Sequence, residues 1–257
     1  MERSAPAADK NSKGWQVLSK KVVEIGAGRR CSERSQISSC AALPDVPVMP
    51  GTLLLMDLGA HEEPIDLHEM TRVVLSDPGA TIQILRMVGR ERLFGDERPT
   101  RIEDCISVLG VQACIEAVSR RTISRAMNKP QIMKAWSHAR KIAETCRLMV
   151  EDAPEVIAPN GAYLTGLLHE LGSLPTILGW ERANAVSSDP AEAGLKMAEE
   201  WFLPQCVVDY FSELGNLKTT SEWTRMVDRA HEVTGAFSER SAFDPRQESQ
   251  ISAYGKL

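Results

Sequence analysis

The stretch that decides the fold runs from Tyr163 to Leu174 and reads YLTGLLHELGSL. It is an apolar run that carries an adjacent imidazole and carboxylate, His169 and Glu170, and it closes on Gly172, a residue suited to ending a helix. Burying such polar groups without partners costs on the order of a few kcal/mol. We therefore expect a metal ion or a hydrogen-bond network to satisfy this pair.

Apolar residues at helical spacing dominate the rest of the chain, and no stretch shows the alternation of a β-strand. Helix starts are marked by two capping pairs, Asp66 with Glu69 and Thr100 with Glu103, and by a first-turn proline, Pro130. In addition to the stretch above, the patterns predict helices over residues 15–25, 52–58, 66–75, 78–88, 100–127, 131–150, 190–201, 204–214 and 221–237. The predicted fold class is all-α.

Composition limits the classes of function. With 43% hydrophobic residues the chain can bury a sizeable core. A net charge of -5 and a pI near 5.7 lack the basic footprint of a nucleic-acid-binding protein, so no nucleic-acid partner is expected. The basic residues Arg120, Arg121 and Arg125 are interpreted as a solvated helix face.

The six cysteines show no C-x-x-C pair and no other metal-ligand spacing. The chain also lacks a signal peptide and an apolar segment long enough to span a bilayer. We therefore expect a cytoplasmic protein without membrane association, with free and mostly buried thiols. The tryptophans Trp136, Trp180 and Trp201 are interpreted as core and junction residues.

Several short motifs occur in the order found in one protein family. The segment GLLHELG at 166–172 resembles the "GLLHDIG" segment of the HD superfamily, whose metal phosphohydrolases place a His-Asp pair there. Other fragments resemble the HDOD (HD-related output domain) branch: LPDVP at 43–47, SDPG at 76–79, VLG at 108–110, AWSH at 135–138 and WFLP at 201–204. The resemblance covers about residues 40 to 236.

The resemblance implies a multi-helix HDOD-like fold in which a small N-terminal helical bundle packs on an HD-like helical bundle. The predicted domain spans residues 40–237, with the N-terminal bundle at 40–129 and the HD-like bundle at 130–237. Residues 1–39 are predicted to be a leader with an amphipathic helical pattern at 15–25, and residues 238–257 a flexible tail.

The resemblance also implies a metal site. By position, His138, His169, Glu170 and Asp228 stand where the HD phosphohydrolases hold a divalent metal such as Mn, Fe or Mg. Glutamate replaces aspartate in the pair, which displaces the carboxylate by about an ångström. A structural interpretation stays open for each residue: a hydrogen-bonded or surface His138, a polar network at His169 and Glu170, and a solvated ion pair at Asp228.

Other candidate residues are weaker. His61, His68 and His231 have no spacing relation to the four predicted ligands, and no role is assigned to them. The catalytic members of the HD superfamily commonly supply further histidines after the pair. The segment from Leu171 to Thr220 contains none.

Two functions from different classes follow. The first is a non-catalytic bacterial signal-transduction module that acts through a protein partner; its metal site is degenerate, and no cofactor is expected unless that site is intact. The alternative is a metal-dependent phosphohydrolase of a nucleotide or cyclic nucleotide, which needs Lys134, Arg140 or Lys141 to face the site and receive the phosphate. A third possibility is binding of a nucleotide without cleavage.

Overall fold

The computed structural model describes residues 45–119, 130–151, 156–179, 187–215 and 222–235. The chain divides into two compact units, Met1–Ala42 and Leu43–Leu257, and all described residues belong to the second. Within these ranges the chain is helical and contains no strand, which confirms the all-α prediction. The predicted leader, the tail, the basic group at 120–125, Trp180, Cys31 and Cys40 lie outside the described residues.

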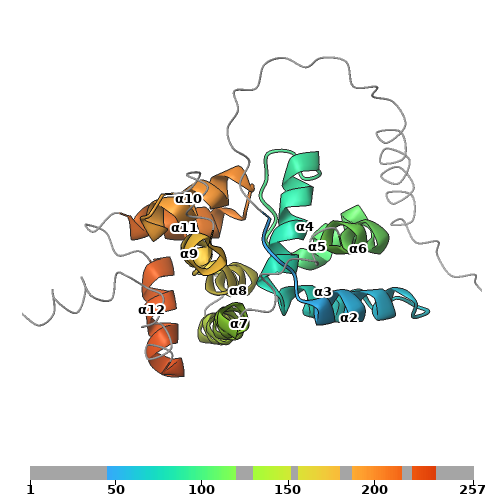
Figure 1. The fold of residues 1–257 in the computed structure, drawn as a ribbon, viewed down its shortest axis with the longest axis horizontal. Coiled ribbons are helices and arrows are strands. Elements are labelled where there is room, and N and C mark those ends of the chain that lie inside the picture. The colour runs from blue at the N-terminus through green and yellow to red at the C-terminus, as the bar shows by residue number, and fades with distance from the viewer. Residues whose placement is uncertain (1–44, 120–129, 152–155, 180–186, 216–221, 236–257) are drawn as a thin grey trace, which may run out of the picture. The chain divides into compact units, whose positions relative to one another are not determined.

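The first group of helices packs among itself (Figure 1). Its members are α2 (Pro50–Ala60), α3 (Leu67–Leu75), α4 (Pro78–Glu91), α5 (Ile102–Leu109) and α6 (Val111–Ser119). Asp66 caps α3 by accepting hydrogen bonds from the backbone N–H groups of His68 and Glu69, as the capping signal predicts. The central helix of the group is α4, which is buried over most of its length.

The second group contains the stretch from Tyr163 to Leu174. Its members are α7 (Pro130–Val150), α8 (Pro159–Leu168), the 3₁₀ turn η2 (Leu171–Ser173), α9 (Leu174–Leu178), α10 (Pro190–Glu200), α11 (Gln205–Leu214) and α12 (Glu222–Thr234). Both α8 and α12 pack on α7, and α11 packs on α10 and α8. Four of these helices carry a proline in the first turn, where its missing N–H costs nothing and its fixed φ suits the helix: Pro130, Pro159, Pro175 and Pro190.

One predicted cap is wrong. The helix expected to start at Thr100 has Arg101 as its N-cap, without a capping hydrogen bond from a side chain. The Arg101 guanidinium lies 3.4 Å from the carboxylate of Glu103 and 3.7 Å from that of Asp104. Glu103 therefore pairs with a neighbouring cation instead of reaching back to a threonine cap.

A buried carboxylate ties the two groups of helices together. Asp77, which is 1% exposed, accepts hydrogen bonds from the backbone N–H of Met49 (2.7 Å) and from those of Gly79 (2.9 Å) and Ala80 (3.3 Å). It also accepts one from Nε1 of Trp136 on α7 (2.9 Å). Burial raises the pKa of Asp77, and these hydrogen bonds oppose that effect. One side chain thus holds the segment before α2, the start of α4 and helix α7.

Further contacts follow the same junction. Arg98 donates a hydrogen bond to the carbonyl of Leu203 (2.8 Å), and Tyr163 donates one to the carbonyl of Leu75 (3.1 Å). Gly89 of α4 lies against Phe202, so close that a Cβ on Gly89 would lie 2.5 Å from the phenylalanine Cβ. Packing and hydrogen bonds therefore join α4 to the α10–α11 region. The predicted bundle boundary near residue 130 stays a prediction.

Buried residues of both groups form a continuous hydrophobic core. Trp136 and Trp201 are 5% and 3% exposed, which confirms their interpretation as core residues. The four described cysteines, Cys105, Cys114, Cys146 and Cys206, are buried free thiols, also as predicted. Among the described residues, no helix is both long and apolar enough to cross a membrane.

Candidate metal centre

The site is built on a very close contact between α7 and α8. Gly166 faces Ala143 of α7, and a Cβ added at Gly166 would lie 2.7 Å from the Ala143 Cα and 3.1 Å from Sγ of Cys146. Any side chain at position 166 would therefore meet the backbone of α7. The glycine lets the two helices approach until residues at the end of α8 reach the same interior as His138.

Helix α8 ends earlier than the sequence suggests. It stops at Leu168, and His169 is its C-cap. The His169 ring lies with Nδ1 2.7 Å from the carbonyl oxygen of Gly166, the acceptor that a continued helix would offer to the N–H of Glu170. Gly172, expected to end the helix, instead lies against Pro190. A Cβ at position 172 would be only 1.8 Å from the Pro190 carbonyl oxygen.

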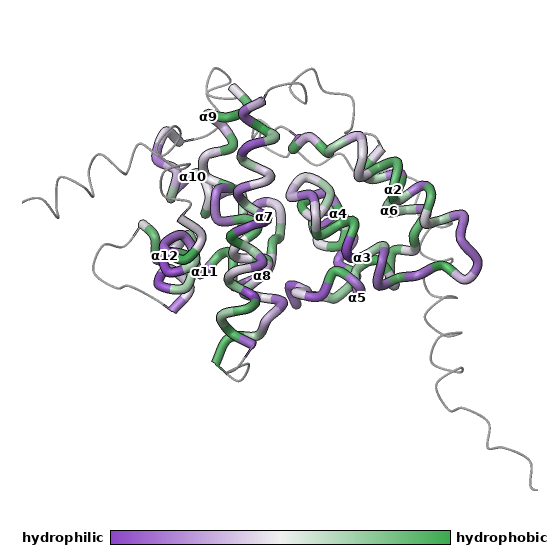
Figure 2. The backbone as a smooth tube through the Cα atoms, turned by 90° about the horizontal axis from the view of Figure 1, so that it is seen from below, coloured by the Kyte–Doolittle hydropathy of each residue, from purple (hydrophilic) through white to green (hydrophobic). Residues whose placement is uncertain are grey.

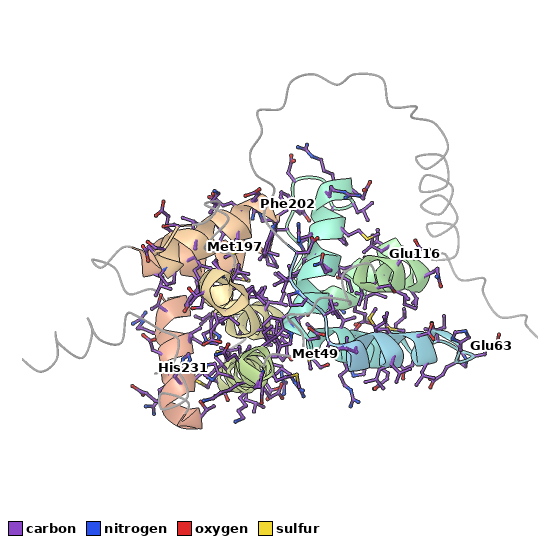
Figure 3. The ribbon with its side chains drawn as sticks, in the orientation of Figure 1. Met49, Glu63, Glu116, Met197, Phe202 and His231 are labelled. Atoms are coloured by element: carbon purple, nitrogen blue, oxygen red, sulfur yellow. The ribbon has the colours of Figure 1, made fainter. Side chains whose placement is uncertain are left out.

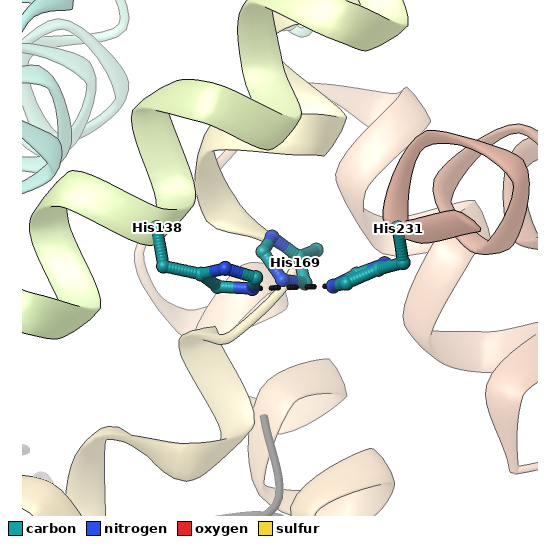
Figure 4. A group of neighbouring side chains, drawn as sticks. All are labelled: His138, His169 and His231. Atoms are coloured by element: carbon teal, nitrogen blue, oxygen red, sulfur yellow. Dashed lines mark hydrogen bonds between the residues drawn. The ribbon is translucent and has the colours of Figure 1, made fainter. Parts of the chain in front are cut away.

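Three histidines from three elements meet in the interior. His138 comes from α7, His169 from the turn after α8, and His231 from α12, and their rings point toward one another (Figure 4). Their exposed fractions are 3%, 4% and 0%. The ring centroids are 4.9 to 5.2 Å apart, and one nitrogen of each ring lies within 4.8 Å of the others. Nε2 of His138 and Nε2 of His231 are 3.2 Å apart.

Backbone contacts fix the chemistry of two of these rings. Nδ1 of His169 faces the Gly166 carbonyl, and Nδ1 of His231 faces the Val227 carbonyl at 2.8 Å. A carbonyl oxygen only accepts, so Nδ1 must carry the proton in both rings. In the neutral imidazole, Nε2 then presents a lone pair to the interior, which is the second-sphere pattern of metal-binding histidines.

The donor set fits a transition metal. Imidazole nitrogens suit Zn, Fe, Cu or Ni, whereas Mg prefers oxygen ligands, so Mg fits least among the metals expected from the sequence. Two imidazoles bound to one tetrahedral zinc at about 2.0–2.1 Å place their nitrogens roughly 3.4 Å apart. The separation of 3.2 Å between His138 and His231 is close to that value. The three buried histidines can therefore hold a metal ion.

The two predicted carboxylate ligands differ in position. Oε1 of Glu170 lies 3.7 Å from Nε2 of His138, and its side chain is 19% exposed, so Glu170 borders the group of histidines. Asp228 is exposed on α12 and is not a member of the group. His231, which has no role in the sequence pattern, stands one helical turn further along and is the third member of the group.

The helical periodicity of the sequence places His231 on a buried helix face, although the motif spacing of the family gives this residue no role. On α12 the buried residues are Met226, Val227, Ala230 and His231. His231 follows Val227 by four residues and therefore lies on the same helix face, whereas Asp228 lies about 100° around the helix from Val227. A histidine on the apolar stripe of a helix thus indicates an inward-facing side chain better than the neighbouring carboxylate does.

A mainly apolar pocket lies next to Glu170, and none of the three histidines is part of its described lining. It contains about 290 Å³ of empty space, part of it open to solvent, and its lining includes Trp136, Leu167, Leu171 and Glu170. Glu170 thus borders both the pocket and the histidines. No lysine or arginine contributes to the described lining. The expected phosphate-binding residues Lys134, Arg140 and Lys141 are exposed on α7.

The fold and this arrangement define an HD-like helical protein, and comparison with known proteins agrees. The chain matches the HDOD domain over residues 46–182, more than half of its length. It belongs to the HDOD domain family. A comparison with curated proteins gave no match.

Two crystal structures of the MmoQ response regulator from Methylococcus capsulatus str. Bath share the fold. One is 15% identical with a TM-score of 0.60, and the alignment covers 81% of this chain and 98% of that one. The other, of the fragment 20–298, is 18% identical with a TM-score of 0.59, and the alignment covers 82% of this chain and 92% of that one.

Proposed function

We propose that the protein is a non-catalytic signalling module, which acts on a protein partner and carries a buried metal centre at His138, His169 and His231. Membership of the HDOD domain family and the likeness in fold to a response regulator support the signalling role. The observation that carries the non-catalytic part is the closure of the histidine group. Its three rings are at most 4% exposed, and the adjoining pocket offers an apolar wall and a glutamate.

This environment suits metal retention better than phosphoryl transfer. A phosphoester carries negative charge, and its hydrolysis depends on cations and donors placed around the transferred group. In the described structure the pocket lining contributes Glu170 in place of such a cation, and like charges repel. A bound metal would supply a fixed positive charge that holds α7, the turn after α8 and α12 together. We expect this metal to be zinc or iron.

Metal content tests the centre. The full-length protein is incubated with zinc, iron or manganese, passed through a desalting column and analysed for metal by elemental analysis. We expect close to one metal ion per chain in the wild type and its loss in His169→Ala and His231→Ala. His68→Ala, which removes an exposed histidine of α3, serves as the matched control and should retain the metal. Metal content that is equal in wild type and His231→Ala would contradict the site.

Turnover tests the class of function. The metal-loaded protein is mixed with p-nitrophenyl phosphate, with bis-p-nitrophenyl phosphate and with cyclic mono- and dinucleotides, and product is followed over hours. We expect no hydrolysis above that of His169→Ala. Hydrolysis that requires the metal and disappears in His169→Ala would establish the alternative, a metal-dependent phosphohydrolase.

A further inference from the structure

Helix α2 exposes an apolar face to solvent. Leu54, Leu55 and Leu58 are 59%, 53% and 56% exposed. At 100° per residue these three leucines fall within about 100° of one another on the helix surface. Thr52 and Met56, the buried residues of α2, lie about 160° around the helix from Leu54 and about 60–100° from Leu55. The helix is therefore apolar on both sides, a pattern typical of a helix that is covered on both sides.

The leucines form the largest such group on a single described helix. The other exposed large hydrophobic residues of the described helices are single or paired: Val108, Met133, Leu148, Met149 and Val233. Ile65, 42% exposed in the connection between α2 and α3, lies just beyond the leucines in sequence. A contiguous apolar patch of this kind on a soluble protein usually marks an interaction site.

The charges around this face have one sign. From residue 46 to residue 71 the sequence contains no lysine or arginine. It contains exposed acidic side chains at Asp57, Glu62, Glu63, Asp66 and Glu69. In Figure 2 the connection after α2 is hydrophilic, and Figure 3 shows Glu63 at its outer end. The first cation after residue 45 is Arg72, whose guanidinium is 3.0 Å from the Glu69 carboxylate.

This combination selects among the occupants of the face. A second copy of the chain in a two-fold dimer would bring the same acidic residues toward each other, which costs free energy. An anionic membrane surface would be repelled in the same way. A helix with an apolar stripe bordered by lysines or arginines would cover the leucines and place opposite charges beside Asp57 and Glu62.

We propose that the outer face of α2, formed by Leu54, Leu55 and Leu58, docks a basic amphipathic helix of a partner protein. The proposal deepens the function argued above, because it names the surface and the chemistry through which the signalling module meets its partner. It does not depend on the metal centre, which lies in the second group of helices.

A synthetic peptide tests the surface directly. The probe is a fluorescein-labelled helical peptide of about 18 residues with leucines at i, i+3, i+4 and i+7 and lysines elsewhere, and binding to the full-length protein is followed by fluorescence anisotropy. We expect the double variant Leu54→Ser/Leu58→Ser to bind at least about 10-fold more weakly than the wild type. The matched control Met133→Ser/Val233→Ser, which removes exposed apolar side chains from α7 and α12, should bind like the wild type.

Charge gives a second, independent readout. Glu62→Lys/Glu63→Lys leaves the leucines in place and should also weaken binding, and added salt should weaken binding to the wild type. The same peptide with glutamate in place of lysine should not bind. Equal binding of the lysine peptide to the wild type and to both double variants would overturn the proposal.

Other occupants give different outcomes. Dimerisation in sedimentation velocity that Leu54→Ser/Leu58→Ser abolishes would assign the face to a second copy and overturn the proposal. Sedimentation with phosphatidylserine vesicles that the same variant abolishes would assign it to a membrane, with the same consequence. Failure here is distinguishable from failure of the proposed function, which would appear as metal-dependent turnover of a phosphoester.

Discussion

Replacing Gly166 with alanine tests the closest helix contact of the site. The new Cβ would lie 2.7 Å from the Ala143 Cα, whereas ordinary contacts begin at 3.4 Å, so α7 and α8 must separate by about 0.7 Å. Overpacking a core costs up to about 3 kcal/mol, and we use this upper value because the atom in the way belongs to the backbone and cannot rotate aside. Alanine offsets about 1 kcal/mol of this cost through its higher helix propensity. We expect a net loss of about 2 kcal/mol in the free energy of unfolding.

Gly161→Ala is the matched control on the same helix. Its nearest contact would be the tip of the Trp223 ring at 3.4 Å, so helix propensity should dominate and stability should stay unchanged or rise by up to about 1 kcal/mol. Both variants are compared with the wild type by urea unfolding followed by far-ultraviolet circular dichroism. In thermal scans the Gly166 variant should melt about 4–8 °C lower than the wild type. Equal stability of the two variants would refute the argument that backbone contact controls the approach of α7 and α8.

Asp77→Ala should lower the free energy of unfolding by about 3 kcal/mol or more in urea titrations, because it leaves several buried N–H groups without their acceptor. A loss below about 1 kcal/mol would show that water replaces the carboxylate. Tyr163→Phe should cost about 1 kcal/mol at neutral pH through the lost hydrogen bond. Burial raises the pKa of Tyr163 from 10 to about 12, so the tyrosine ionises first in the unfolded chain. Between these pH values the wild type, unlike the variant, should therefore lose about 1.4 kcal/mol of stability per pH unit. A stability difference between the two proteins that stays constant with pH would contradict this. Burial raises the pKa values of Cys105, Cys114 and Cys146 to about 12, so mass spectrometry should find them unmodified by iodoacetamide at pH 8 until urea unfolds the protein; rapid labelling of the native protein would oppose the buried placement.

Much of the helical architecture could be predicted because its signals are local. Asp66 caps its helix through its own neighbours in sequence, and Pro130 starts α7 because its ring geometry suits a first turn. Periodicity likewise placed Trp136 and Trp201 in the core. Each of these outcomes depends on residues within one or two helical turns.

The site was only partly predictable because it depends on distant pairs. His138 and His231 are 93 residues apart, and their contact depends on how α12 packs against α7. The motif at 166–172 marked His169, but it did not show that the imidazole would occupy the Gly166 carbonyl and end the helix at Leu168. The family pattern pointed to a carboxylate at Asp228, whereas the apolar stripe of α12 carries His231 inward.

The hydrogen bonds to Asp77 bear on how the protein can be divided. Its acceptor oxygens serve Met49, the start of α4 and Trp136, so neither group of helices can keep all of these contacts without the other. A fragment that begins at residue 130 would expose the Trp136 indole and lose its acceptor, and a fragment that ends before it would bury a carboxylate with one donor fewer. We therefore expect the two groups of helices to unfold in a single cooperative transition.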